Sequence, residues 1–165
     1  MADEGRGAPV GAGVPGVPGV VAVDHVGIAV RDLDEAIRFH TEVLGLVLVH
    51  RETNEQQGVA EAMLAAAPAP ASPGGPVDGA AQVQLLAPLD DASPLARFLE
   101  RSGPGLQQLA YRVADLDHAC AELRTRGLRL LYDRPASGTR GSRINFVHPR
   151  DAGGVLLELV EVAVP

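Results

Sequence analysis

The chain has 165 residues, of which 46% are hydrophobic and 21% are charged. That length and composition fit one packed domain or two small repeated modules, and they exclude an assembly of several domains. The formal net charge of −7 argues against a nucleic-acid partner, because binding to phosphates needs a basic face. All 14 basic residues are arginines, so a Schiff-base lysine and a lysine-containing phosphate loop are excluded as well.

The start of the chain and its cysteine content bear on where the protein works. Residues 1–20 are rich in Gly and Pro and lack the basic start and continuous apolar stretch of a signal peptide, so they are predicted to form a disordered tail. No apolar run approaches the roughly 20 residues needed to cross a bilayer. Cys120 has no second cysteine with which to pair. We expect a soluble, cytoplasmic protein without a membrane partner.

Residues 21–91 predict a first βαβββ module. An alternating strand pattern covers His25–Val30, and Asp32 then begins a capping-box pattern for a helix that should end at Gly45. Three extended segments follow, at Leu46–Arg51, Val59–Leu64 and Gln82–Leu86. The Pro/Gly-rich stretch Ala65–Ala81 between the last two is expected to be a mobile loop.

The pattern of this module recurs 83 residues later (108 minus 25). The stretch HVGIAVRDLDEA, which begins at His25, aligns without a gap with QLAYRVADLDHA, which begins at Gln108. A short helix over residues 93–101 should link the two copies, since Ser93 can cap it and Pro94 suits its first turn.

The second module is predicted over residues 105–161. Asp115 should cap its helix, and Gly127 should end it. Three extended segments again follow, at Leu128–Tyr132, Ser142–Val147 and Val155–Val160. Each module is too small to bury its sheet alone, so the two should form a single domain over residues 21–165. The predicted fold class is α+β, with two tandem βαβββ modules that form a cupped mixed sheet.

Strand alternation predicts a polar patch on the concave side of this sheet. In the first strand Val26, Ile28 and Val30 share an apolar face, and His25 lies on the opposite one. The same parity gives four more candidates for the concave side, namely Glu61, Gln84, Gln108 and Glu158. A single His or Gln in a strand is more often structural, but carboxylates inside apolar strands are costly to bury unpaired. Together these residue types indicate a metal site with an adjacent base.

The order and spacing of several motifs carry a family resemblance. DHVGIAV, QGVAEAML, VQLLAPL, LLYDRP, SRINFVHP and GVLLELVE, set in paired βαβββ modules, resemble the methylmalonyl-CoA epimerases of the vicinal oxygen chelate (glyoxalase) superfamily. The resemblance implies a sheet cupped around a divalent metal ion with four ligands, namely His25, Gln84, Gln108 and Glu158. It also implies two catalytic bases, Glu61 and Glu158. The family has two histidines where this chain has Gln107 and Gln108, so Gln108 stands at the usual second histidine ligand.

The implied reaction interconverts the 2R and 2S forms of methylmalonyl-CoA, or of a close 2-alkylmalonyl-CoA. One carboxylate removes the proton at C2 and a second group returns a proton on the other face, through an enediolate that a divalent ion stabilises. An amide oxygen at Gln108 favours harder ions than imidazole does, so the identity of the ion stays open among Co, Mn, Zn, Ni and Mg. The resemblance further implies an acyl-CoA thioester as partner and a homodimer.

Substrate contacts are predicted at three polar residues after a Gly-rich turn, namely Ser142, Arg143 and Asn145, although these residues also fit a plain polar turn. Arg134 and Arg140 are further candidates for contacts with the phosphates of coenzyme A, on charge alone. Two other functions stay open: a non-catalytic small-molecule-binding protein of the same fold, and another enediolate-forming isomerase or a dioxygenase. The dioxygenase ranks last because it needs two His and one carboxylate, whereas only one His is predicted on the concave side.

Overall fold

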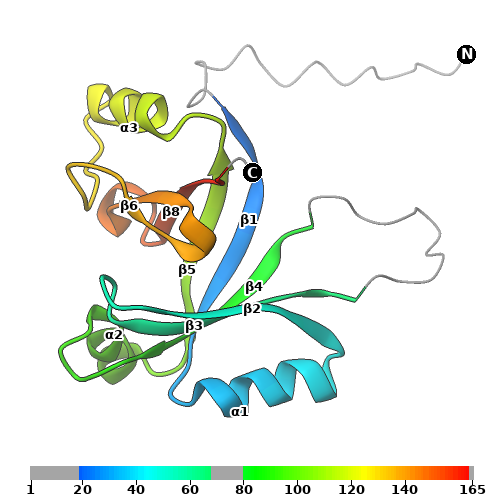
Figure 1. Ribbon diagram of the computed structural model, residues 1–165. Coiled ribbons are helices and arrows are strands. Elements are labelled where there is room, and N and C mark those ends of the chain that lie inside the picture. The colour runs from blue at the N-terminus through cyan, green and yellow to red at the C-terminus, as the bar shows by residue number, and fades with distance from the viewer. Residues whose placement is uncertain (1–18, 68–79, 164–165) are drawn as a thin grey trace, which may run out of the picture.

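The computed structural model describes residues 19–67 and 80–163, and in these ranges the protein has one mixed sheet of eight strands (Figure 1). The strands are β1 (Val20–Ala29), β2 (Leu46–Asn54), β3 (Val59–Ala66), β4 (Gln82–Pro88), β5 (Gly105–Val113), β6 (Ala136–Ser137), β7 (Arg143–Val147) and β8 (Leu156–Glu161). The helices are α1 (Leu33–Arg38), which continues as a π-helical turn (Phe39–Val43), α2 (Pro94–Ser102) and α3 (Leu116–Thr125). The predicted α+β class is confirmed. Most of the predicted tail and of the predicted loop Ala65–Ala81 lies outside the described residues.

The two modules meet at the centre of the sheet, whose strand order is β2-β3-β4-β1-β5-β8-β7-β6. β1 and β5 pair antiparallel, while β4 runs parallel to β1 and β8 runs parallel to β5. Gly27 pairs with Gln84, and Ala110, which follows Gly27 by the repeat offset (110 minus 27 is 83), pairs with Glu158. The repeat therefore supplies two pairs of equivalent positions, His25 with Gln108 and Gln84 with Glu158.

Helices cover both faces of the sheet. Asp32 caps α1 by accepting a hydrogen bond from the Glu35 amide at 2.8 Å, and Asp115 caps α3 in the same way from the His118 amide at 2.8 Å. On the convex face, Leu33 of α1 shares an apolar cluster with Leu64 and Leu85 of the sheet. Leu116 and Leu123 of α3 share another with Leu159. α2 instead closes one end of the concave face, through Leu95 and Leu99 packed on Ala29, Val59 and Leu86.

One predicted strand is wrong. Leu128–Tyr132 contributes only a single bridge, from Leu130 to Val147, and the short edge strand β6 lies further along the chain. The reason is a side chain that replaces the backbone ladder: Asn145 Oδ1 accepts from the Tyr132 amide at 3.2 Å, and Asn145 Nδ2 donates to the Tyr132 carbonyl at 3.0 Å. Because these groups are satisfied by a side chain, strand pairing stops there.

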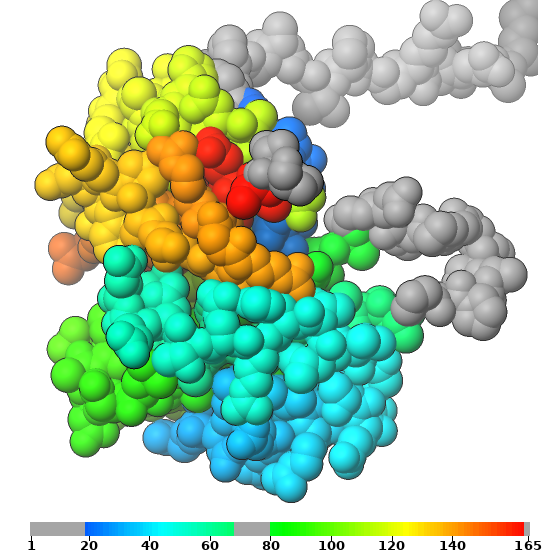
Figure 2. Space-filling view, viewed as in Figure 1, coloured from blue at the N-terminus to red at the C-terminus, as the bar shows by residue number. Residues whose placement is uncertain are grey.

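The second module also reaches across to the first at the open edge of the cup. Asn54 Nδ2 on β2 donates to the Ser137 carbonyl on β6 at 3.5 Å, and the Arg140 amide donates to Glu52 Oε2 at 3.3 Å. Figure 2 shows the same contact, with the β6–β7 segment in orange lying on the β2–β3 segment in cyan. None of the helices in the described ranges has the length and apolar character that a membrane span requires.

Candidate active site

A buried polar cluster lies on the concave face of the sheet. Five strands each contribute one member, namely His25 from β1, Glu61 from β3, Gln84 from β4, Gln108 from β5 and Glu158 from β8, and none is more than 8% exposed. The structure thus brings together all five side chains that strand alternation had assigned to this face. Within the described residues, every buried side-chain nitrogen and oxygen has a hydrogen-bond partner.

The members of the cluster contact one another in a continuous chain. His25 Nε2 lies 3.0 Å from Glu158 Oε2, and Gln108 Nε2 donates to the same Glu158 oxygen. Gln108 Nε2 also lies 3.1 Å from Gln84 Oε1 and 3.5 Å from His25 Nε2. Gln84 Nε2 in turn donates to Glu61 Oε2 at 2.7 Å. Two carboxylates are therefore joined through two amides.

A glycine allows this close approach between β1 and β5. Gly27 pairs with Gln108 in the antiparallel register, and a Cβ atom on Gly27 would lie 2.5 Å from Gln108 Cγ. Carbon atoms in contact normally stand about 3.5–4.0 Å apart, so a larger residue would displace the Gln108 side chain. Gly27 therefore keeps open the space that Gln108 occupies.

Sequence reasoning missed the residues that orient His25. His25 Nδ1 lies 3.0 Å from Asp24 Oδ1, and Arg112 Nε donates to Asp24 Oδ2 at 2.8 Å. Burial would lower the pKa of His25, but hydrogen bonds and charge from Asp24 and Glu158 outweigh it and raise this pKa to about 9. Strict alternation would place Asp24 on the other face, but the pairing of β1 with β5 shifts register between Val23 and His25.

Glu61 is the most buried of the five polar side chains, and a loop residue holds it. Thr139, in a 3₁₀ turn at Thr139–Gly141, donates from Oγ1 to Glu61 Oε1 at 2.8 Å. Burial raises the pKa of Glu61 to about 7; the Thr139 hydrogen bond opposes this shift, whereas Glu52 and Glu158 add to it. A carboxyl group with such a pKa can act as an acid or a base near neutral pH.

Two cavities flank the cluster. One, of about 240 Å³, is lined by His25 and Glu158 together with Thr139, Arg140 and Ser142. The other, of about 280 Å³, lies beside Gln108 and is bordered mainly by apolar side chains that include Leu86, Leu131, Phe146 and Leu156. A small molecule can therefore reach the cluster from a polar side and from an apolar side.

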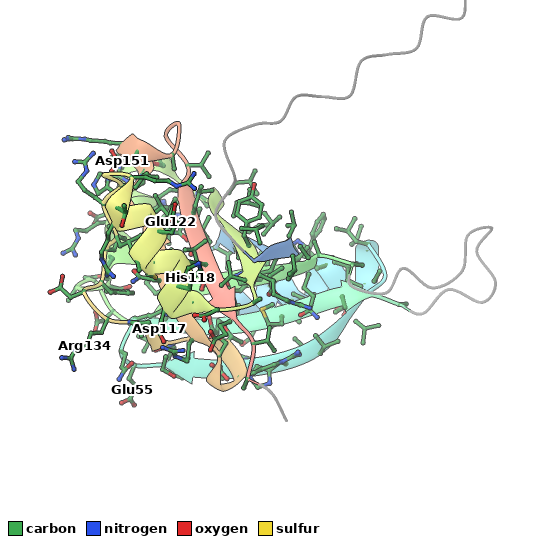
Figure 3. All side chains as sticks on the ribbon, turned by 90° about the horizontal axis from the view of Figure 1, so that it is seen from above. Glu55, Asp117, His118, Glu122, Arg134 and Asp151 are labelled. Atoms are coloured by element: carbon green, nitrogen blue, oxygen red, sulfur yellow. The ribbon has the colours of Figure 1, made fainter. Side chains whose placement is uncertain are left out.

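The predicted substrate contacts separate into two groups. Ser142 lines the polar cavity, but Arg143 forms ion pairs with Asp117 and Glu161 on the α3 side of the sheet. Asn145 is fully buried and bonds to the Tyr132 backbone, as described above. The structure therefore assigns both residues to the scaffold instead of the cavity. Arg134 lies at the periphery and extends away from the ribbon in Figure 3.

The sequence identifies the class of protein to which this arrangement belongs. Residues 24–146 match the Glyoxalase/Bleomycin resistance protein/Dioxygenase superfamily, and the chain is a member of that superfamily. The resemblance drawn from the motifs is thus confirmed.

Within this superfamily, several of the relatives found are epimerases. The crystal structure of methylmalonyl-CoA epimerase from Mycobacterium tuberculosis is 52% identical, with a TM-score of 0.80 over 92% of this chain and 94% of that one. A variant of Streptomyces coelicolor methylmalonyl-CoA epimerase in complex with 2-nitronate-propionyl-CoA is 41% identical, with a TM-score of 0.78 over 88% of this chain and 99% of that one. Ethylmalonyl-CoA/methylmalonyl-CoA epimerase of Cereibacter sphaeroides is 30% identical over 85% of this chain and 97% of its own length.

Proposed function

We propose that this protein epimerises methylmalonyl-CoA, or a close 2-alkylmalonyl-CoA, at C2. The observation that carries the proposal is the pair of buried carboxyl groups, Glu61 and Glu158, that belong to one polar cluster beside a cavity. Epimerisation at a carbon between two carbonyl groups needs a base on one face and an acid on the other. Methylmalonyl-CoA epimerases that match this chain along nearly their whole length support the choice of substrate.

In this mechanism the two carboxyl groups exchange roles with the direction of reaction. Glu61 removes the C2 proton of one epimer, and Glu158 delivers a proton to the opposite face; the reverse reaction starts at Glu158. Thr139 and Gln84 donate hydrogen bonds to both oxygens of Glu61, which holds that carboxylate in one orientation. His25 Nε2 and Gln108 Nε2 both contact a single oxygen of Glu158, Oε2. Each base is thereby fixed on its own side of the cluster.

The residues of the cluster also fit a divalent ion. An octahedral ion with bonds of about 2.1 Å separates neighbouring ligand atoms by about 3.0 Å. The cluster has atoms at such separations: 3.0 Å between His25 Nε2 and Glu158 Oε2, and 3.1 Å between Gln108 Nε2 and Gln84 Oε1. The amide of Gln108 can turn to present its oxygen, since amide nitrogen and oxygen are assigned from hydrogen bonds alone.

We therefore assign His25, Gln84, Gln108 and Glu158 as the residues that would hold the ion. When bound there, the ion would supply positive charge to the substrate oxygens that gain negative charge as the C2 proton leaves. The described residues contain no cluster of three or more His, Cys, Asp or Glu side chains suited to a metal, so two of the four ligands in this proposal are neutral amides. This donor set favours the harder ions among Mg, Mn, Co, Ni and Zn.

Substrate recognition is proposed for the polar cavity. Ser142 can donate to a substrate carboxylate, and Arg140, which lines the same cavity, can bind an anionic group such as that carboxylate or a phosphate. A cytoplasmic location and a homodimer complete the proposal; both come from the sequence and its resemblance.

The decisive experiment follows exchange at C2. The purified protein is incubated with methylmalonyl-CoA in deuterated water, with and without a series of divalent ions, and deuterium at C2 is measured by mass spectrometry. Uptake of deuterium together with interconversion of the epimers is expected, and it should depend on the ion. Binding of the thioester without any uptake, under every ion, would refute the epimerase and indicate a binding protein of the same fold.

A further inference from the structure

A second carboxyl group lies against Glu61. Glu52 on β2 is directly opposite Glu61 on β3 in the antiparallel register. Residues opposite each other in such a pair have Cβ atoms about 4.5–5.5 Å apart on the same face of the sheet. Two glutamate carboxyl groups on opposite residues can share one proton, because a protonated carboxyl group donates a hydrogen bond and an ionised one accepts it. Glu52 is thus placed to exchange a proton with Glu61 directly.

Glu52 also connects this buried position with solvent. Glu61 is 1% exposed, whereas the side chains of Glu52 and His50 are 28% and 30% exposed. His50 Nε2 contacts Glu52 Oε2, and a surface depression of about 380 Å³ borders Glu52 on the solvent side. The other two partners of Glu61, Gln84 and Thr139, are neutral groups that do not ionise at ordinary pH.

A strained loop of the other module holds the two carboxyl groups in place. Arg140 has φ 56° and ψ 32°, a left-handed conformation that is unusual for a residue with a Cβ atom. This conformation accompanies a hydrogen bond from its amide to Glu52 Oε2, while the preceding Thr139 donates to Glu61 Oε1. Such strain persists only where the surroundings impose it, and here it lets one turn contact both carboxyl groups.

Epimerisation by two bases creates a need for such a connection. When Glu61 takes the C2 proton and Glu158 gives one up, each turnover leaves Glu61 with one proton too many and Glu158 with one too few. A second substrate of the same configuration can react only after Glu61 has lost its proton and Glu158 has regained one. Because Glu61 is buried, its proton needs a path to water.

We propose that Glu52 is a positioning residue that passes the proton of Glu61 to and from solvent, with His50 at the outer end of the path. The proton leaves a Glu61 carboxyl oxygen for the Glu52 carboxylate and moves on to His50 or water, while no bond to carbon changes and no electron is transferred. The inference rests on the proposed epimerase function.

The test measures exchange on each epimer separately. Each pure epimer is turned over in deuterated water, and deuterium at C2 is measured early in both product and unreacted substrate. Deuterium in unreacted substrate reports how often the base exchanged its proton before returning it. The Glu61→Gln variant identifies which epimer depends on Glu61, because it abolishes exchange for that epimer.

Glu52→Gln should lower this exchange, relative to product formation, on the order of tenfold. This loss is smaller than the contribution of a positioned base itself, which is about 10²–10⁴-fold. The epimer that depends on Glu158 should exchange as in the wild type. Glu52→Ala leaves space for added formate, which should restore exchange for the affected epimer only and should not change the wild type. Glu55→Gln is the matched control, since Glu55 follows on the same segment and points away from the ribbon in Figure 3.

Each alternative outcome has a distinct meaning. Unchanged exchange of both epimers in Glu52→Gln would show that the proton of Glu61 reaches solvent by another path, and the inference would be overturned. An equal loss for both epimers, without rescue by formate, would also overturn it, because it would show a general distortion of the site. A wild-type protein that neither epimerises nor exchanges would instead refute the proposed function.

Discussion

A single methyl group added at Gly27 tests the packing that positions Gln108. The new Cβ would lie 2.5 Å from Gln108 Cγ, 3.1 Å from Gln108 Cδ and 3.2 Å from Leu86 Cδ1. Gly27 does not have a positive φ, so the effect of Gly27→Ala comes from this contact and not from backbone strain. Overpacking of this kind costs about 1–3 kcal/mol, and the lower entropy of the unfolded alanine chain offsets about 0.4–1 kcal/mol of it.

We therefore expect Gly27→Ala to lower the free energy of unfolding by about 0.5–2 kcal/mol. The sign of this change in the free energy of unfolding should reverse when the side chain of Gln108 is truncated as well. Gln108→Ala removes Cγ and Cδ, so the methyl group then meets only the movable end of Leu86, and Gly27→Ala should become neutral or stabilising by a few tenths of a kcal/mol.

The assay is urea unfolding of the wild type, the two single variants and the double variant, followed by circular dichroism with a chelator present, so that ion binding does not add stability. The coupling energy between the two sites is read from this double-mutant cycle. An equal cost of Gly27→Ala in both backgrounds would refute the reasoning, because Gln108 would then not be the group that the methyl displaces.

Three further predictions concern the bases, the ligands and the scaffold. Glu61→Gln should reduce epimerisation by about 10²–10⁴-fold with metal content unchanged; a variant that loses its ion, or that keeps its rate, would show that Glu61 is not the unligated base. Gln108→His should raise bound zinc, nickel or cobalt relative to magnesium and manganese in elemental analysis after identical loading; equal metal content in both proteins would contradict the assignment of Gln108 as a ligand. Asp151, whose pKa the bidentate Arg129 holds well below its usual range, should contribute stability above about pH 4, the ordinary carboxyl pKa, and lose it as pH falls. The Tm difference between wild type and Asp151→Asn should accordingly shrink at low pH, and a difference that is constant with pH would rule out this ion pair as its source.

Period-two alternation made the polar cluster predictable. Residues such as Glu61 and Glu158 stand out in the sequence because they interrupt apolar strands, and the parity of each strand follows from its hydrophobic neighbours. The helix boundaries were predictable for a similar reason, since the capping Asp and the terminal Gly are local signals. Gly45 and Gly127 indeed have φ of 72° and 81°.

Residues that depend on strand register or loop conformation could not be found in this way. Phe146 pairs with Glu158, so its side chain lies on the concave side of β7. The neighbouring Asn145 therefore points to the other face, toward Cys120 of α3. Without that register, Asn145 looked like a cavity residue. Thr139 reaches the site through a turn of the other module, and no periodicity in the sequence reports such a contact between modules.

The pairs of repeat-equivalent positions have a mechanical consequence. His25 and Gln84 come from the first half of the chain, and Gln108 and Glu158 come from the second, so any ligand that engages all four spans the seam between β1 and β5. A ligand bound at this site would then stabilise the contact between the two halves, and its free energy of binding would add to the free energy needed to separate them. Amide hydrogens along β1 and β5 are the ones whose exchange should slow most when the site is filled.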